Sequence, residues 1–384
     1  MKILHVVPTY LPATRYGGPI VSVHGLCVAL NALGHEVHVI TTNVDGSGNS
    51  KVPLFQSVDV DGVKVWYFPS RILRRLYWSP SMKKALLQVV PSFDVVHIHS
   101  IFLWPTWAAA RVAERSGIPY VVSPRGMLVR DLIRRKSRLL KSTWAKFIER
   151  HTLASASAVH VTANKELEEL RRFDFDLPVV WTVPNGVDGP GGYLLKRADD
   201  FPGLEQFALF LGRISWKKGL DRLIKAWKNV PDITLLIAGN DEESYQIELE
   251  RLATKIGVAD RIRFVGMVQG DSKWRLFRDA ELFVLPSYSE NFGISVLEAM
   301  FMGCPVVVTP EVGLAEAIAE SDAGLVIAGD PNSLGRAIGK LLSDPDRRQE
   351  MGENGRRLAS TRYSWQRVAR QMASEYETII TDHV

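Results

Sequence analysis

The chain has 384 residues, of which 46% are hydrophobic and 23% charged, with 47 Lys and Arg against 42 Asp and Glu. At about 150 residues per domain, this length predicts two or three globular domains, and the composition excludes disordered, collagen-like and low-complexity proteins. No apolar run approaches the roughly 18 residues that span a bilayer, and the N-terminus lacks a signal-peptide pattern. Two distant cysteines, Cys27 and Cys304, make neither a disulfide framework nor a metal cluster. We therefore expect a cytoplasmic protein.

Strands and helices alternate along the first half of the chain. The apolar segment 2–7 predicts a strand, residues 20–33 show the apolar spacing of a helix, and residues 35–41 alternate as a strand does. Further strands are predicted at residues 63–68, 95–98 and 120–123. This alternation is typical of a doubly wound parallel sheet.

The same pattern restarts in the second half. The segment 184–192 holds four glycines and two prolines and is the best linker candidate. Strands are predicted at residues 207–211, 234–238, 262–265, 282–285 and 305–309. We therefore expect two Rossmann-like α/β domains, residues 1–190 and 191–364, with a last helix at 365–384 that packs back on the first domain.

Ligands of such sheets bind at the carboxyl ends of the strands, so the loops that follow the strands are the candidate sites. Gly17 and Gly18 follow the first strand, where two glycines either let the backbone approach an anionic ligand or form a plain tight turn. The chain has neither a G-x-G-x-x-G nor a Walker motif there. Arg213 and Lys218 follow the first strand of the second domain, where they either suit a diphosphate or belong to a solvated basic loop.

The segment from Glu290 to Glu298 is the most informative one. Gly293 frees the backbone before a helix whose N-terminus would point N–H groups at a phosphate or a sugar oxygen. Glu290 could accept hydrogen bonds from sugar hydroxyls, and Glu298 from a ribose. The pattern alone favours a different role for Glu298, because Ser295 to Glu298 fits a capping box that serves its own helix.

Two patterns that suggest metal binding are better explained otherwise. His97 and His99 would share one face of a strand. No Cys, Asp or third His completes a metal-binding set near them, so packing or hydrogen bonding is expected. The D-x-D pairs are interpreted as structural, and they lie at Asp59–Asp61, Asp174–Asp176 and Asp344–Asp346.

Basic side chains are concentrated in the first half of the chain. Residues 1–190 carry 23 basic and 14 acidic side chains, and residues 71–150 alone carry 16 against 4. This surplus is either a solvated face or a surface for an anionic partner. Residues 125–150 also combine helical apolar spacing with many cations, which fits a helix on a membrane surface or one packed on its own domain. No pattern indicates nucleic-acid binding.

In combination these motifs resemble the family 4 glycosyltransferases, a retaining family with the two-domain GT-B fold. The resemblance covers essentially the whole chain and is most specific at the E-x7-E element from Glu290 to Glu298. Its other motifs are Gly17-Gly18, the segment 94–99, the segment 184–188, Gly212-Arg213, Lys217-Lys218-Gly219, Ile237-Ala238-Gly239 and Gly303-Cys304-Pro305. The segment 123–128 also resembles a bacterial subgroup that makes surface polysaccharides.

The resemblance implies that a sugar is transferred from a UDP- or GDP-sugar with retention of configuration, and with no cofactor or required metal. In the family, Arg213 and Lys218 would bind the diphosphate and Glu290 the donor sugar, so these three would carry catalysis. Glu298 would bind the ribose. The full set that matches the donor site is Gly17, Gly18, Arg213, Lys218, Met267, Val268, Glu290, Asn291, Phe292, Gly293, Ile294 and Glu298.

One position departs from the family. Many members carry a His near the transferred sugar, at the end of the strand that follows the one ending at His99, and here that position is Arg125. We expect Arg125 or His99 to contact a donor or acceptor oxygen. The acceptor would be an anionic glycan or lipid-linked molecule, with peripheral membrane contact through the basic first domain. A nucleotide-sugar epimerase of the same layout and a non-catalytic nucleotide-sugar or lipid-binding protein remain as alternatives.

Overall fold

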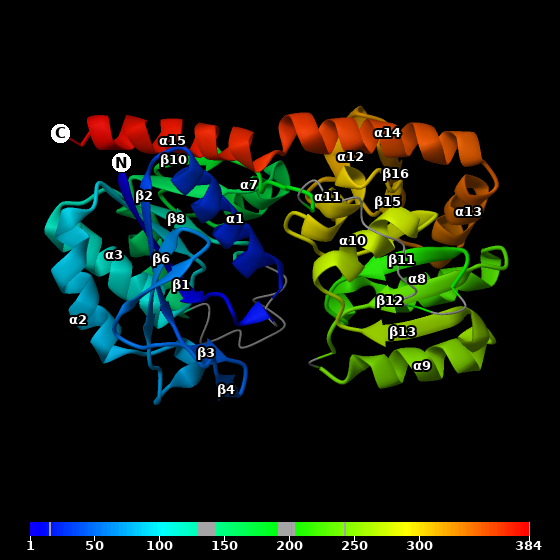
Figure 1. Ribbon diagram of the computed structural model, residues 1–384, viewed down its shortest axis with the longest axis horizontal. Coiled ribbons are helices and arrows are strands. Elements are labelled where there is room, and N and C mark those ends of the chain that lie inside the picture. The colour runs from blue at the N-terminus through cyan, green and yellow to red at the C-terminus, as the bar shows by residue number, and fades with distance from the viewer. Residues whose placement is uncertain (15–16, 130–142, 191–200, 202–203, 242, 384) are drawn as a thin grey trace. The chain divides into compact units, whose positions relative to one another are not determined.

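The computed structural model describes residues 1–384 except 15–16, 130–142, 191–200, 202–203, 242 and 384. The chain forms two compact α/β units (Figure 1). The first unit comprises Met1–Gly186 and Trp365–Val384, and the second comprises Val187–Ser364. The chain therefore leaves the first unit within the glycine-rich segment 184–192 and returns to it at the C-terminal helix.

The first unit is built on an eight-stranded sheet with the strand order β10-β9-β8-β7-β1-β2-β6-β5. Its neighbouring strands are parallel except β5 and β6, which are antiparallel. The strands are β1 (Lys2–Thr9), β2 (Glu36–Thr42), β5 (Ser57–Val60), β6 (Val63–Phe68), β7 (Val95–His99), β8 (Tyr120–Ser123), β9 (Ala158–Val161) and β10 (Val179–Thr182). A separate small hairpin follows β2 and consists of β3 (Val44–Asp45) and β4 (Gly48–Asn49).

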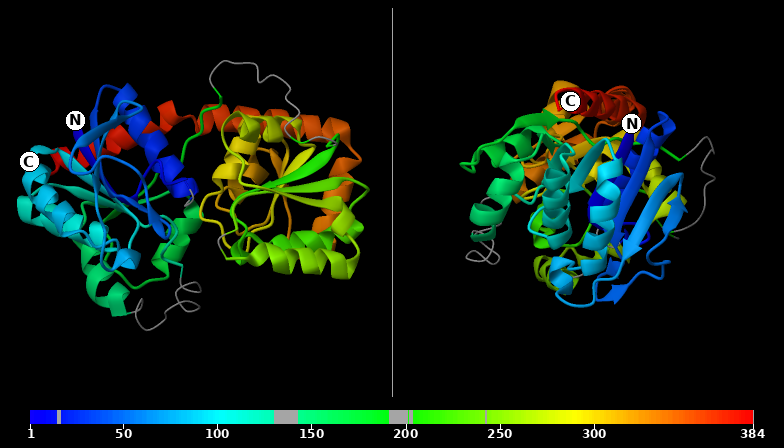
Figure 2. Two further views of the ribbon diagram at one scale, coloured as in Figure 1. Left: turned by 60° about the horizontal axis from the view of Figure 1, so that its bottom comes forward. Right: turned by 90° about the vertical axis from the view of Figure 1, so that its left-hand side faces the viewer.

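Helices cover both faces of this sheet (Figure 2). They are α1 (Gly18–Ala32), α2 (Pro80–Val89), α3 (Trp104–Ser116), α6 (Arg150–Ala154), α7 (Asn164–Arg171) and α15 (Trp365–Thr381), with a π-helical turn at Ala145–Glu149 and 3-10 turns at Arg74–Leu76 and Val90–Ser92. Leu4 and Val6 of β1 belong to the core with α2 and α3, while Ile3 and Val7 belong to the core with α1 and α15. The period of two along β1 thus places apolar residues in both cores.

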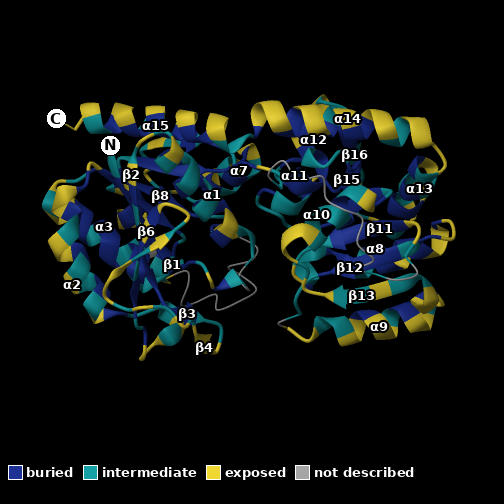
Figure 3. Cartoon of the chain, in the orientation of Figure 1, coloured by how far each residue is buried: buried dark blue, intermediate teal, exposed yellow. Residues whose placement is uncertain are grey.

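The second unit has a six-stranded parallel sheet with the order β13-β12-β11-β14-β15-β16. Its strands are β11 (Phe207–Leu211), β12 (Thr234–Ala238), β13 (Ile262–Gly266), β14 (Leu282–Leu285), β15 (Val306–Val308) and β16 (Gly324–Val326). Its helices are α8 (Leu220–Ala226), α9 (Tyr245–Ile256), α10 (Gly270–Asp279), α11 (Ile294–Phe301), α12 (Ala315–Glu320), α13 (Pro331–Leu342) and α14 (Pro345–Arg362), with 3-10 turns at Trp216–Lys218, Trp227–Asn229 and Ala259–Arg261. Figure 3 shows that the central strands β11, β12, β14 and β15 are mostly buried, whereas the edge strand β13 is partly exposed, and α13 and α14 present exposed residues.

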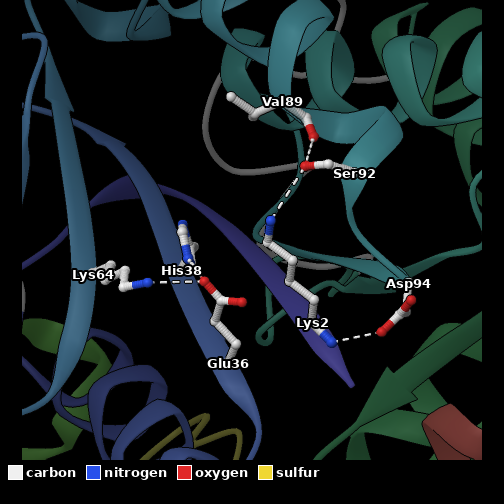
Figure 4. A network of polar contacts seen from close by, with 7 residues as sticks. All are labelled: Lys2, Glu36, His38, Lys64, Val89, Ser92 and Asp94. Carbon is white, nitrogen blue, oxygen red and sulfur yellow. Dashed lines mark hydrogen bonds and ion pairs between the residues drawn. The ribbon is translucent and has the colours of Figure 1, made fainter.

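The amino ends of the strands in the first sheet are tied by exposed polar contacts (Figure 4). The backbone N–H of Lys2 donates to Asp94 Oδ2 at 2.6 Å. Lys64 Nζ and His38 Nε2 both approach Glu36 Oε1, at 2.8 and 2.9 Å. Because exposed ion pairs contribute little stability, this edge has a structural role at most.

The predicted α/β architecture is confirmed, and several predicted boundaries coincide with the observed ones. The strands predicted at 207–211, 234–238 and 282–285 are β11, β12 and β14. Asp61 lies in the turn between β5 and β6, and the Asp344 side chain caps α14 by accepting from the Arg347 N–H at 3.0 Å. Residues 130–142 of the basic amphipathic segment lie outside the described residues. Among the described helices, none combines the length and apolarity of a membrane span.

Candidate active site

The carboxyl ends of β11 and β14 mark the place in the second sheet where the strand order reverses. Open α/β sheets bind ligands at such a switch point, because the loops that follow the two strands diverge there. The loop after β11 carries Lys218, and the loop after β14 carries Glu290. The two residues that the sequence analysis singled out therefore flank the expected position of a ligand.

Lys218 and Glu290 form an ion pair, and their side chains are 16% and 18% exposed. The two loops are held together by backbone contacts, since the Tyr288 N–H donates to the Lys217 carbonyl at 2.7 Å. Gly219 has a φ of +68°, and a Cβ there would lie 2.0 Å from the Pro286 carbonyl oxygen. Only glycine fits this approach, so the sequence Lys-Lys-Gly places the lysine against the glutamate.

The backbone of Glu290 is fixed on its other side by a strand-like contact with residues 311–313. Its N–H donates to the Glu311 carbonyl at 3.1 Å, and the Gly313 N–H donates to the Glu290 carbonyl at 3.0 Å. The carboxylate thus projects from a backbone that is hydrogen-bonded in both directions. Such rigid support is what a positioned acceptor of sugar hydroxyls requires.

The helix α11 begins directly after Gly293, which has a φ of +102° and contributes no side-chain cap. The N–H groups of Ile294 and Ser295 are therefore available to a phosphate or sugar oxygen at a helix N-terminus. The capping-box interpretation of Ser295 and Glu298 is wrong, because Ser295 lies inside the helix rather than at its N-cap. Asn291 and Phe292 complete the turn into α11, and Phe292 is buried.

Glu298 is 8% exposed and pairs with Lys273 of α10, whose Nζ lies 2.7 Å from Oε1. The ammonium group also lies 4.4 Å from the centre of the Trp274 ring. Lys273 is a residue that the sequence analysis missed, because nothing in the local pattern around it points to Glu298. The pair leaves the second carboxylate oxygen of Glu298 for another donor, such as a hydroxyl.

The remaining donor-site candidates of the second unit lie at the ends of other strands. Arg213 follows β11 and is exposed. Met267 and Val268 follow β13, and Met267 is 54% exposed. An exposed apolar side chain at this edge is a suitable surface for a flat heterocycle.

In the first unit, Gly17 and Gly18 lie where β1 leads into α1. Gly17 is the N-cap residue of α1 with a φ of +72°, and no side chain caps that helix. The loop therefore presents a second helix N-terminus, although Pro19 has no N–H and the Ile20 N–H donates to the Gly17 carbonyl at 3.2 Å. The structure places Gly17 and Gly18 in a different unit from Lys218 and Glu290.

Four histidines of the first unit lie together and are at most 2% exposed: His5, His97, His99 and His160. The expectation that no third histidine lies near His97 and His99 is wrong, because β1 and β7 are neighbours and pair His5 with His97 in register. Burial lowers the pKa of His5 and of His160 to about 3, and it holds the pKa of His97 and His99 well below the usual range. All four are therefore neutral at pH 7.

Neutral rings fix the direction of the hydrogen bonds on one side of this cluster. His160 Nε2 donates to the Val183 carbonyl at 2.8 Å, so its Nδ1 accepts from the Ser123 hydroxyl at 2.6 Å. The Ser123 oxygen accepts from His97 Nε2 at 3.2 Å, and His97 Nδ1 accepts from the Tyr376 hydroxyl at 2.5 Å. This chain of bonds links α15 to the first sheet, and the sequence analysis missed it because its members are far apart in the chain.

The other side of the cluster ends at Arg125. Arg125 Nη2 donates to His99 Nδ1 at 3.1 Å, which leaves the hydrogen of His99 on Nε2 to donate to His5 Nδ1 at 2.9 Å. Nitrogen atoms of His5, His97 and His99 lie within 4.8 Å of one another, close enough for one metal ion. The present hydrogen bonds already use both nitrogens of His97 and His99. The positive charge of Arg125 would also repel a metal cation at this position. The cluster is therefore better suited to hydrogen bonding than to metal binding.

Two family models match the chain, one in each half. Residues 17–186 match the glycosyl transferase 4-like domain, and residues 195–358 match the model of glycosyl transferases group 1. An uncharacterized glycosyltransferase of Methanocaldococcus jannaschii is 29% identical over 403 residues, which covers 98% of this chain and 98% of the relative. A D-inositol 3-phosphate glycosyltransferase of Catenulispora acidiphila is 28% identical and covers 99% of this chain and 94% of the relative.

Solved structures show the same fold at lower identity. A sucrose-phosphate synthase from Thermosynechococcus elongatus has a TM-score of 0.77 at 22% identity, with both chains covered completely. Anabaena HepE in complex with UDP and glucose has a TM-score of 0.73 at 19% identity, covering 98% of this chain and all of the other. With a glycosyl transferase 4-like domain followed by a group 1 glycosyl transferase domain, the chain is a glycosyltransferase of the GT-B fold.

Proposed function

We propose that this glycosyltransferase moves a sugar from a nucleotide-sugar donor to an anionic acceptor, with retention of configuration and without a metal. The observation that carries the proposal is the ion pair of Lys218 and Glu290 at the switch point of the second sheet, followed by the uncapped N-terminus of α11. Cations, a carboxylate and open backbone N–H groups are the groups that a sugar diphosphate needs.

The chemistry follows from where charge develops. When the bond between the anomeric carbon and the diphosphate breaks, negative charge grows on the leaving diphosphate. Lys218, Arg213 and the N–H of Ile294 would stabilise this charge, which is the part that a divalent cation plays in other enzymes. A bound diphosphate would compete with Glu290 for Lys218, and the released carboxylate would accept hydrogen bonds from the donor sugar.

The anomeric configuration would be retained because the acceptor hydroxyl attacks the anomeric carbon from the same face that the diphosphate leaves. A phosphate oxygen of the leaving diphosphate would take the proton of this hydroxyl. No carboxylate of the described second unit is needed as a covalent nucleophile in this scheme. Glu298 would hold the ribose, and Met267 and Val268 would contact the base. The loop at Gly17 and Gly18 would close over the diphosphate, and the basic first unit would bind the acceptor.

Two classes of anionic acceptor fit the basic first unit. Relatives named D-inositol 3-phosphate glycosyltransferases favour a phosphorylated polyol. A lipid-linked glycan of surface polysaccharide, with the enzyme at the inner face of the cytoplasmic membrane, is the alternative acceptor. Both acceptors are anionic, in agreement with the basic surplus of residues 71–150.

Calorimetry against a panel of UDP- and GDP-sugars, with and without chelator, tests the donor side. We expect selective binding of one donor in the micromolar range that a chelator does not change, and its loss in Lys218→Ala. Lys225→Ala is the matched control, because Lys225 follows in α8, is 48% exposed and pairs with Asp221 four residues away. Failure of every nucleotide sugar to bind would contradict the proposal.

Product analysis separates the rival functions. Conversion of the nucleotide sugar to another isomer in the absence of any acceptor would indicate an epimerase. Tight donor binding with no release of nucleotide under any phosphorylated or lipid-linked acceptor would indicate a binding protein. Release of nucleotide together with an acceptor product of the donor's anomeric configuration supports the transferase.

A further inference from the structure

The carboxyl edge of the first sheet gathers polar residues from the ends of three strands. His99 ends β7, Arg125 follows β8, and Asn185 follows β10. Arg125 Nη1 donates to Asn185 Oδ1 at 2.9 Å, while Nη2 and Nε lie 3.1 and 3.4 Å from His99 Nδ1. The guanidinium is thus held between two side chains that the fold brings together from positions far apart in the sequence.

Both of these acceptors are neutral. Asn185 is an amide. Burial keeps the pKa of His99 well below the usual range, and the neighbouring groups, including His97 and Arg125, lower this pKa further. Among the described residues, no carboxylate forms an ion pair with Arg125. Burial lowers the pKa of Arg125, and the charges of Glu166, Tyr376 and Cys27, with Glu166 first, act in the opposite direction. A cation in this setting lacks the compensation that buried charges normally have.

Glu166 itself is engaged elsewhere, although it is 5% exposed and close in the fold. Its Oε1 accepts from the Gly126 N–H at 2.6 Å, and its Oε2 accepts from the N–H and hydroxyl of Thr162 at 2.8 and 3.0 Å. The carboxylate therefore fixes the turn that carries Arg125, but it does not neutralise the guanidinium. Three of the five N–H groups of Arg125 contact His99 and Asn185, and the other two have no acceptor among the described residues.

The backbone at this edge is unusual as well. Ser100, Phe102 and Arg125 have φ values of +75°, +62° and +54°, a conformation that residues with a side chain rarely adopt. Such conformations persist where surrounding contacts impose them, and they occur preferentially at ligand sites. The first sheet reverses its strand order between β1 and β7, so His99 lies at the switch point and Arg125 lies in the loop after the next strand, β8.

We propose that Arg125, oriented by His99 and Asn185, binds the phosphate group of the acceptor. A planar guanidinium with two open N–H groups suits two phosphate oxygens, and a phosphate supplies the directly contacting anion that Arg125 lacks among the described residues. This inference rests on the proposed function and deepens it, since it names the acceptor as a phosphate ester. The ester is either a soluble phosphorylated polyol or a lipid phosphate.

Calorimetry on the full chain with saturating UDP tests this site. The soluble probes are D-myo-inositol 3-phosphate and unphosphorylated inositol, and the lipid probes are phosphatidylcholine vesicles with and without undecaprenyl phosphate. We expect one phosphorylated probe to bind and its unphosphorylated counterpart to fail. Arg125→Gln should weaken that binding about tenfold or more while UDP binding stays at the wild-type level.

Asn185→Asp is the decisive second variant, because it leaves Arg125 in place and gives it a carboxylate partner. It should weaken binding of the phosphorylated probe about tenfold without lowering the melting temperature. A merely structural role of Arg125 predicts no such loss, since the new ion pair would hold the guanidinium at least as firmly. Arg111→Gln is the matched control for loss of one positive charge, as Arg111 lies in α3 of the same unit and pairs with Glu114.

Three results would overturn the inference while leaving the donor site intact. In the first, the wild-type chain binds neither phosphorylated probe. In the second, Arg125→Gln and Asn185→Asp both bind the probe with wild-type affinity. In the third, Arg125→Gln loses UDP binding as much as probe binding, which would assign Arg125 to the donor. Failure of the wild-type chain to bind UDP would instead contradict the proposed function.

Discussion

At the scale of single residues, the two units differ in whether a charged side chain at the candidate site contacts an opposite charge. Lys218 with Glu290 and Lys273 with Glu298 are opposite charges in contact, whereas Arg125 is surrounded by neutral acceptors. A pair can release either partner to a ligand that carries both charge and hydroxyls. A cation without a carboxylate partner can bind an anion but offers no acceptor to hydroxyls. We therefore propose a sugar diphosphate for the second unit and a phosphate for the first.

Removing either member of the first pair should abolish transfer. Lys218→Ala removes a cation from the leaving diphosphate, and Glu290→Ala removes the acceptor for the donor sugar. Each should lower kcat by roughly a hundredfold or more. Both positions are partly exposed, so the circular dichroism spectrum and the melting temperature should stay close to wild type. Turnover at the wild-type rate in either variant would refute the site assignment, and Lys225→Ala again serves as the control.

The second pair predicts a non-additive effect on stability. Lys273→Met leaves the Glu298 carboxylate, which is 8% exposed, without its cation, and this should lower the free energy of unfolding by about 1–3 kcal/mol. The double variant with Glu298→Gln should recover most of that loss, because neither side chain is then an unpaired charge. Urea denaturation of the four members of the cycle measures the coupling. Strict additivity would mean that the two side chains act independently.

The positions of the candidate site residues were predictable only where a local pattern indicated them. The sequence around Glu290, Gly293 and Lys218 is sufficient to locate the loops of the second sheet, and the structure brings Lys218 and Glu290 into contact. The capping-box pattern at Ser295 failed, because the N-cap is Gly293, two residues earlier. Lys273 could not be found, since its contact with Glu298 depends on how α10 packs against α11.

At the scale of elements, close backbone approaches position the site more than the strands themselves do. Gly219 lies where the loop after β11 meets the loop after β14, and a Cβ at this position would lie 2.0 Å from the Pro286 carbonyl. Gly257, the residue after α9, has a similar φ of +75° but no atom within 4 Å of a Cβ. The two glycines share a conformation and differ only in their surroundings.

This difference gives a matched experiment. Gly257→Ala should lower the free energy of unfolding by about 1 kcal/mol, the cost of a left-handed alanine. Gly219→Ala should cost about 3 kcal/mol or more, because the backbone must also move away from Pro286. It should also weaken donor binding, which Gly257→Ala should leave unchanged. Equal losses of stability and unchanged donor binding in both variants would show that the Pro286 contact does not position the site.

The helix α15 packs on the first sheet through an apolar interface that contains a buried polar contact. Tyr376 is fully buried among residues such as Trp181 and Met372, and its hydroxyl donates to His97 Nδ1. Tyr376→Phe leaves that nitrogen without a donor, which should cost about 1–3 kcal/mol. Hydrogen exchange in α15 should accelerate. Tyr120→Phe, which removes a buried hydroxyl bonded to the Thr152 carbonyl, should leave exchange in α15 unchanged.

Periodicity predicted the elements well because it depends on burial, and burial is nearly complete in the central strands of both sheets. It predicted the strand at 207–211 to the residue. Polar contacts between residues far apart in the chain cannot be predicted from periodicity. His5, His97 and Tyr376 meet because parallel register and the return of the chain at Trp365 bring them together, and neither feature has a local signature.

At the scale of the whole molecule, the buried histidines make stability depend on pH. In the unfolded chain each imidazole has a pKa near 6.5, whereas in the folded chain burial lowers the pKa of His5 and His160 to about 3. Between these values the unfolded state binds more protons than the folded state. The stabilisation from neutral histidines is therefore fully present above pH 6.5 and is lost as the pH falls from 6.5 towards 3.

Urea denaturation at several values between pH 7.5 and 5 measures this effect, in a window above the titration of most carboxylates. Each buried histidine should contribute a slope of about 1.4 kcal/mol per pH unit once the pH is below 6.5. His160→Gln should reduce the slope by about one proton, because it removes one buried group from the cluster, even if the variant is less stable overall. Tyr120→Phe should leave the slope unchanged, since burial raises the pKa of the Tyr120 hydroxyl further above this window. The same slope in His160→Gln and wild type would mean that His160 is already protonated in the folded chain, which would reverse the hydrogen-bond directions assigned to Ser123 and His97.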